Sequence, residues 1–182
     1  MAAHEMQTSN SSPDFLQGGG DLGALMRARD WSASLGAPGD WPQNLKTCLR
    51  ICLASRQPMW VWWGKDLINF YNDAYLPVIG AKHPAALGRP ARQVWREVWP
   101  QIEERVAATL SGRSSYSEAE LLILERNGYR EETYYTFSFS PVRDDDGGVG
   151  GIICANTDDT ERVRGVRRLV LLRDLAAHVW GA

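Results

Sequence analysis

Residues 59–74 have the sequence MWVWWGKDLINFYNDA, which is the clearest structural pattern in the chain. Two short apolar runs, rich in the aromatic and branched residues that suit pleated strands, are joined by the turn sequence GKD. Asn72 or Asp73 can then cap a short helix that begins near Ala74. The stretch therefore predicts a β-hairpin that leads directly into a helix.

Aromatic side chains occupy both faces of the first strand of this hairpin. Side chains alternate along a strand, so Trp60 and Trp62 share one face. The opposite face carries Met59, Val61 and Trp63. Because both faces are apolar, both must be covered. We expect one face to meet the core or a ligand pocket, and the other to meet an N-terminal helix or a second subunit.

The composition of the chain is that of one folded domain with short extensions. It has 182 residues, of which 44% are hydrophobic and 23% are charged. Its 20 basic and 22 acidic residues give a net charge of −2, so no general field favours nucleic acid or an anionic membrane. No signal-peptide pattern is present, and no run approaches the roughly 20 apolar residues of a membrane span. We expect a cytoplasmic location, no membrane insertion and no nucleic-acid partner.

The three cysteines, Cys48, Cys52 and Cys154, are an odd number, so a disulfide framework is not expected. Cys48 and Cys52 are four residues apart and would share one face of a helix. Neither a nearby histidine nor a second cysteine pair accompanies them, so a zinc site is not expected either. The interpretation we favour is that they are small buried hydrophobic residues.

Two segments precede the hairpin. Residues 1–20 are polar and end in three glycines, which predicts a disordered tail. Residues 21–57 contain two helical patterns, at 21–29 and 43–55, on either side of a loop rich in glycine and proline. This second segment is expected to form an N-terminal helical cap.

The predicted core covers residues 58–157. Its patterns predict a short helix at 74–79, a longer helix at 93–110, and three strands at 115–124, 130–142 and 149–156. Tight turns rich in asparagine, aspartate and glycine join the three strands as hairpins. Residues 158–182 then predict a linker and a terminal helix of about six turns. This order gives an α+β domain with five antiparallel strands and helices gathered on one face.

The order of these motifs resembles the PAS sensor domain. The matching motifs are Tyr71-Asn72-Asp73-Ala74, Leu87-Gly88-Arg89-Pro90, Asn127-Gly128-Tyr129, the glycine-rich turn at 145–151 and Asp158-Asp159-Thr160-Glu161-Arg162. In the last motif, Asp159 stands where such domains carry a hydrophobic residue. The segment from Asp30 to Arg56 also resembles one PAS subgroup, which heads bacterial hybrid sensor histidine kinases.

The resemblance implies a five-stranded antiparallel sheet with helices on one face, an N-terminal helical extension and a C-terminal signalling helix. It implies a homodimeric sensory module that detects a signal through a hydrophobic pocket or its dimer interface. The change would pass to an output partner, a histidine kinase or similar, in a bacterial two-component pathway. The relay residues would be Asp158, Asp159, Thr160 and Glu161. The alternative hypothesis is a ligand-free dimerisation or docking module.

An enzymatic function is not expected for this chain. Its paired carboxylates, among them Glu118 and Glu120, alternate with apolar residues on predicted strands and are expected to face solvent. Its glycine-rich runs lack the strand–turn–helix context of a phosphate-binding loop. A catalytic kinase or cyclase domain, if any, would lie outside this sequence.

Residue requirements separate the cofactors of this family. A photoadduct-forming flavin receptor of the LOV type needs a cysteine in the segment that corresponds to residues 88–99, and none is present. Haem needs an axial ligand, usually a histidine on the long helix, and that helix has none, so haem is not expected. Three alternatives stay open: aromatic side chains that simply fill the core, which we favour, a fatty or aromatic small molecule, and non-covalent flavin. The pocket candidates are Trp60, Trp62, Tyr71, Asn72, Trp95, Trp99, Tyr135, Phe137 and Phe139.

Overall fold

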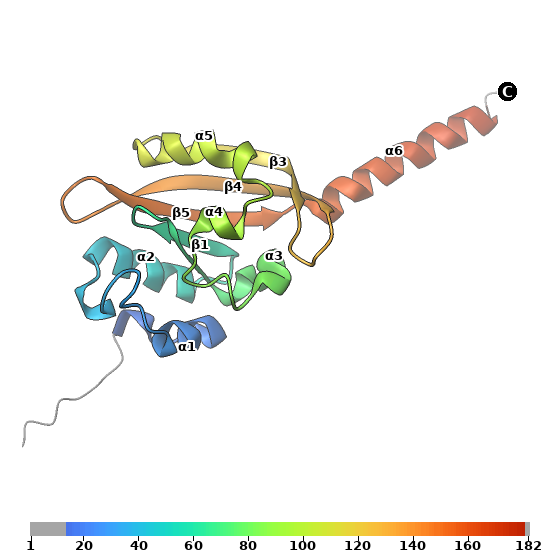
Figure 1. Cartoon of the computed structure of the whole chain (residues 1–182). Coiled ribbons are helices and arrows are strands. Elements are labelled where there is room, and N and C mark those ends of the chain that lie inside the picture. The colour runs from blue at the N-terminus through green and yellow to red at the C-terminus, as the bar shows by residue number, and fades with distance from the viewer. Residues whose placement is uncertain (1–13, 181–182) are drawn as a thin grey trace, which may run out of the picture.

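The fold is an α+β domain built on one five-stranded antiparallel sheet with strand order β2-β1-β5-β4-β3 (Figure 1). The structure is a computed structural model that describes residues 14–180, with side chains up to His178. The strands are β1 (Met59–Trp63), β2 (Ile68–Tyr71), β3 (Ser115–Leu124), β4 (Glu131–Arg143) and β5 (Val149–Asp158). The helices are α1 (Gly20–Ala28), α2 (Gln43–Ala54), α3 (Leu76–Ile79), α4 (Ala91–Val94), α5 (Trp99–Leu110) and α6 (Thr160–Trp180). The fold class predicted from the sequence is confirmed.

The hairpin predicted from residues 59–74 is present as β1 and β2, with Trp60 opposite Tyr71 and Trp63 opposite Ile68. The predicted capping of the next helix is wrong. A 3₁₀ turn at Asp73–Tyr75 follows the hairpin, and the side chain of its first flanking residue, Asn72, makes no capping bond to it. Both polar side chains are used elsewhere, in contacts with α1 and α2.

Asp73 caps α1 instead of its own helix. Its carboxylate accepts hydrogen bonds from the backbone N–H groups of Asp21, at 3.0 Å, and Leu22, at 2.8 Å. These N–H groups belong to the first turn of α1, where no intrahelical partner exists. Asp145, in the β4–β5 turn, caps α2 in the same way by accepting from the backbone N–H of Gln43 at 2.9 Å. Two carboxylates of the core therefore hold the N-terminal ends of both preceding helices.

The N-terminal segment covers the second face of β1 and β2, opposite α4 and α5 (Figure 1). On this face Phe70 stacks on Trp31, with ring centroids 5.0 Å apart, and meets the edge of Trp41 at 5.6 Å. Val61, on the same face of the neighbouring strand, is fully buried. The sequence left open whether an N-terminal helix or a second subunit covers this face, and the N-terminal segment of the same chain covers it.

Part of the predicted N-terminal tail is ordered. Residues 1–13 lie outside the described part of the chain. Residues Asp14–Leu16 form a 3₁₀ turn in which Phe15 and Leu16 are buried against the core. A pair of apolar residues within a polar stretch is therefore enough to anchor residues 14–16 on the core.

The predicted helix at 93–110 is two helices, α4 and α5, separated by residues 95–98. Pro100 occupies one of the first two positions of α5. Proline has no N–H to donate to the preceding turn, so it is tolerated at a helix start and not in the interior. The interruption lets both Trp95 and Trp99 point into the core, where each is buried.

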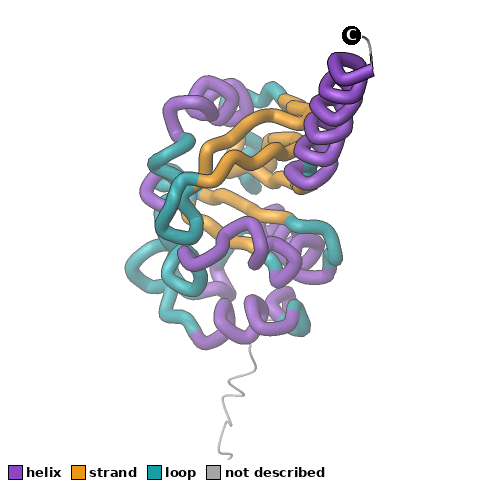
Figure 2. Tube along the Cα trace, turned by 90° about the vertical axis from the view of Figure 1, so that its right-hand side faces the viewer, coloured by secondary structure: helices purple, strands orange, loops and turns teal. Residues whose placement is uncertain are grey.

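The terminal helix α6 begins at Thr160 and extends away from the sheet (Figures 1 and 2). Several of its apolar side chains are exposed, including Leu169 at 68% and Leu172 at 54%. None of the described helices has the length and apolarity needed to span a membrane. The three cysteines are free, with Cys52 and Cys154 buried.

Candidate functional site

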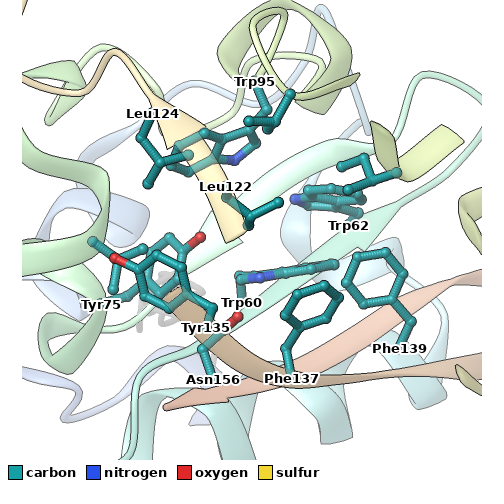
Figure 3. A pocket seen from close by; sticks show the side chains of 13 residues that line it. Trp60, Trp62, Tyr75, Trp95, Leu122, Leu124, Tyr135, Phe137, Phe139 and Asn156 are labelled. Atoms are coloured by element: carbon teal, nitrogen blue, oxygen red, sulfur yellow. The ribbon is translucent and has the colours of Figure 1, made fainter. Parts of the chain in front are cut away.

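A cavity of about 50 Å³ lies between the inner face of the sheet and helices α3 to α5 (Figure 3). Its lining side chains are aromatic or aliphatic except for one asparagine, and all of them are buried in the fold. They are Trp60, Trp62, Tyr75, Val78, Trp95, Val98, Ile102, Leu122, Leu124, Tyr135, Phe137, Phe139 and Asn156.

A tryptophan pair forms one wall of this cavity (Figure 3). Trp60 and Trp62 project from the same face of β1 and stack with their ring centroids 3.9 Å apart and their planes at 20°. Phe139 meets the edge of Trp60 at 5.2 Å, a favourable aromatic geometry. The Trp62 indole N–H donates to Asn69 Oδ1 at 2.9 Å, and the Asn69 amide donates to the carbonyl of Ala86 at 3.1 Å. The wall is thus fixed both by packing and by buried hydrogen bonds.

Tyr135 connects the cavity to the end of the sheet. Its ring lines the cavity, and its hydroxyl accepts a hydrogen bond from Arg126 Nη1 at 2.9 Å and donates to Asp158 Oδ2 at 3.3 Å. Burial raises the pKa of the Tyr135 hydroxyl, and the neighbouring Asp158 carboxylate raises it further against the opposing effect of Arg126. The phenol therefore stays protonated and keeps its proton for Asp158.

Asp158 is in turn the cap of α6. Its second oxygen, Oδ1, accepts from the backbone N–H of Thr160, the first residue of that helix, at 2.9 Å. A single carboxylate therefore receives one hydrogen bond from a residue that lines the cavity and one from the start of the terminal helix. The Thr160 hydroxyl also accepts from the backbone N–H of Tyr134 at 3.0 Å, which ties this helix start to β4.

Asp159 provides a second tie between the sheet and α6. Its carboxylate accepts from the hydroxyl of Thr136 on β4 and from Arg162 Nε at 2.8 Å. The hydrogen bond from Arg162 and then the one from Thr136 lower the pKa of Asp159 below its usual value. These two partners, Thr136 and Arg162, explain why a polar residue, Asp159, stands at a position of the motif that is usually hydrophobic. Glu161, by contrast, is exposed and forms a long ion pair with Arg164, at 3.8 Å.

Six of the nine candidate pocket residues lie around the cavity: Trp60, Trp62, Trp95, Tyr135, Phe137 and Phe139. The other three lie elsewhere. The Tyr71 hydroxyl pairs with His83 Nδ1 at 3.0 Å, and Trp99 packs behind Trp62 at 5.8 Å between ring centroids. The Asn72 amide donates to the carbonyls of Cys52, Ser55 and Gln57, so it joins α2 to the sheet and has no role as a ligand donor.

Sequence reasoning missed most of the residues that close the cavity from the helices and from β3. The missed side chain with the greatest chemical interest is Asn156, which lies opposite Phe137 in the β4–β5 register. Strand alternation was a usable signal for it. Phe137 was expected on the inner face, and a directly paired residue points to the same side of a sheet.

The comparison with protein families identifies this architecture. A family model described as the PAS fold matches residues 54–164, which is more than half of the chain. The chain belongs to the PAS family. No curated protein matches it.

One solved structure with a TM-score above 0.5 shows the same fold as this PAS domain. An RNA-binding light-oxygen-voltage receptor is 24% identical with a TM-score of 0.52; the match covers 76% of this chain and 40% of that one. The PAS domain of BvgS from Bordetella pertussis is 22% identical over 63% of this chain and 84% of its own, with a TM-score of 0.40. A sensory box histidine kinase from Vibrio cholerae is 15% identical over 63% and 86%, with a TM-score of 0.41. The PAS chain thus spans about 40% of the length of the receptor that it matches first.

As the side chains lie here, the cavity of this PAS domain is smaller than a flavin ring. An engineered protein cavity of about 150 Å³ admits a molecule of benzene. The cavity here is about 50 Å³, and a three-ring isoalloxazine is much larger than benzene. The space that such a ring would need is taken by Trp60, Trp62 and Trp95, which are buried and packed against their neighbours.

Proposed function

We propose that this PAS domain is a sensory module that relays the state of its cavity to α6 through Tyr135 and Asp158. The observation that carries the proposal is the shared carboxylate: Asp158 accepts from the hydroxyl of a cavity-lining tyrosine and from the first N–H of α6. A displacement of the Tyr135 ring changes the first of these bonds. Because both bonds use the same side chain, the cap of α6 responds to it.

The contacts of Arg126 support a two-state junction. This arginine donates to the Tyr135 hydroxyl and to the carbonyl of Pro77 in α3, at 2.9 Å and 2.8 Å, and pairs with Glu131. It therefore joins β4 to a helix on the far side of the cavity. A ligand that separates the sheet from α3 would strain this contact and release Tyr135.

The proposed partner is an output domain that follows α6 or docks on it, a histidine kinase or a similar enzyme of bacterial signal transduction. The exposed apolar side chains of α6, Val166, Leu169 and Leu172 among them, support a parallel pairing with a second copy of the chain. Pairing of this helix would place two output domains side by side. The PAS domain itself would contribute no catalysis.

A chimeric kinase tests this proposal. Residues 14–180 replace the sensor of a histidine kinase, and autophosphorylation is measured for the parent and for Tyr135→Phe, which keeps the ring and removes the hydroxyl. We expect the variant to change the rate about fivefold, which corresponds to the loss of one hydrogen bond near 1 kcal/mol. Tyr116→Phe, at an exposed tyrosine of β3, is the control. Equal rates in all three proteins would refute the relay.

The small cavity favours a second candidate function, a ligand-free docking module. In that case the aromatic side chains only fill the core, and signals arrive through contacts with other proteins. Direct binding to the cavity distinguishes the two candidates, because the docking module would bind no small molecule there.

A further inference from the structure

The side-chain amide of Asn156 is a buried donor without a partner. Asn156 is 7% exposed and lines the cavity from β5, next to Tyr135 and Phe137 (Figure 3). Its Oδ1 accepts a hydrogen bond from the thiol of Cys154 at 3.6 Å, whereas its Nδ2 has no hydrogen-bond partner. Buried polar atoms in folded proteins are nearly always paired, so an unpaired one at a cavity wall points to a ligand atom that would pair with it.

The free atom fixes the chemistry of its partner. An amide N–H donates, so the missing group is a hydrogen-bond acceptor. Among the described residues that line the cavity none is charged, and a charged ligand would lose its hydration without compensation. The partner is therefore a neutral acceptor.

The volume and the walls limit its size and its remaining atoms. A cavity of about 50 Å³ is roughly a third of the volume that admits benzene, so it holds a molecule of only a few non-hydrogen atoms. Buried water typically makes about three hydrogen bonds. Apart from Asn156 the walls are mostly aromatic and aliphatic, and their polar atoms are tyrosine hydroxyls and indole N–H groups, of which the Tyr135 hydroxyl and the Trp62 N–H already have partners. A compact organic molecule with one acceptor and an apolar remainder matches these walls better than water does.

We propose that the cavity binds a neutral molecule of a few non-hydrogen atoms that accepts a hydrogen bond from Asn156 Nδ2, such as a short ketone or aldehyde. This names the ligand class of the sensing site, and so it rests on the proposed sensory function. The apolar part of the molecule lies against the stacked pair Trp60 and Trp62. With the side chains in this arrangement, the cavity is too small for an aromatic ring such as benzene.

Two probes of equal shape test the proposal on the full chain. Acetone and 2-methylpropene have the same branched skeleton, but only acetone carries an acceptor oxygen. Each is titrated into ¹⁵N-labelled protein, and the side-chain amide signal of Asn156 is followed by NMR. We expect acetone to bind about tenfold more tightly than 2-methylpropene and to shift that signal, since one hydrogen bond to a buried donor is worth about this factor. Equal affinities, or no binding of either probe, would overturn the proposal.

A variant pair adds a second arm. Asn156→Leu keeps the size of the side chain and removes its donor, and it should bring acetone to the affinity of 2-methylpropene. Thr157→Val, at the exposed neighbour that faces the other side of the sheet, should leave both affinities unchanged. An undiminished preference for acetone in Asn156→Leu would also contradict the proposal. The comparison of probes on the parent chain holds if the leucine variant fails to fold, and neither arm depends on whether Tyr135 relays the signal.

Discussion

At the scale of single residues, Asn72 shows how one side chain can join two parts of the chain. Its amide lies within 2.8–3.1 Å of three carbonyls at and beyond the end of α2, and its Oδ1 accepts from the backbone N–H of Met59 at 3.1 Å. The last carbonyls of a helix have no intrahelical partner, so Asn72 supplies one. With Asp73 on α1, two consecutive residues attach the N-terminal segment to the hairpin.

We expect Asn72→Ala to lower the free energy of unfolding by about 3 kcal/mol, because several buried polar groups lose their partner at once. Denaturant unfolding followed by tryptophan fluorescence measures this change. Asn44→Ala, at an exposed asparagine of α2, should cost less than about 0.5 kcal/mol. A loss at Asn72 no larger than at Asn44 would show that the contacts around Asn72 do not stabilise the fold.

At the scale of secondary-structure elements, the junction between β5 and α6 depends on ionised carboxylates. The pKa of Asp159 lies below its ordinary value of 3.8 because Arg162 and Thr136 donate to its charged form. Its contribution to stability is therefore complete above pH 3.8 or so and is lost as the pH falls through the lowered pKa. We expect the parent chain to lose more stability than Asp159→Asn between neutral pH and pH 2.5 or so. Unfolding curves at a series of pH values measure this difference, and parallel pH profiles for the two proteins would contradict it.

The elements themselves were predictable from local pattern, and their contacts were not. Strand alternation and turn residues located the hairpin at 59–74 and the three later strands, because those signals depend on neighbours in sequence. The partners of Asn72 and Asp73 are up to 52 residues away, and no local rule assigns them. Aromatic content identified six of the thirteen residues that line the cavity, whereas the place of Asn156 follows from its pairing with Phe137 across two strands.

At the scale of the whole molecule, α6 is the part of the chain that one copy leaves uncovered. It extends beyond the sheet (Figure 2). From Val166 to Leu175 its large apolar side chains are at least 40% exposed. Leu169, Leu172 and Ala176 have the three- and four-residue spacing of a helix seam. A second copy of α6 would cover this seam, which supports the proposed homodimer.

We expect Leu172→Lys to raise the dimer dissociation constant at least tenfold, because it places a charge where the dimer would bury a leucine side chain, worth roughly 1.5–3 kcal/mol. Leu171→Lys is the matched control, because Leu171 lies outside the seam. In a single copy Leu171 is 63% exposed and Leu172 is 54% exposed. Light scattering across a concentration series measures both. Equal weakening by the two substitutions would indicate a general effect of charge on α6, and a monomeric parent chain would refute the dimer. If only Leu172→Lys weakens the dimer, the pairing surface lies on α6. Because Asp158 accepts from the first N–H of that helix, the cavity, the relay and the dimer interface would then be directly connected.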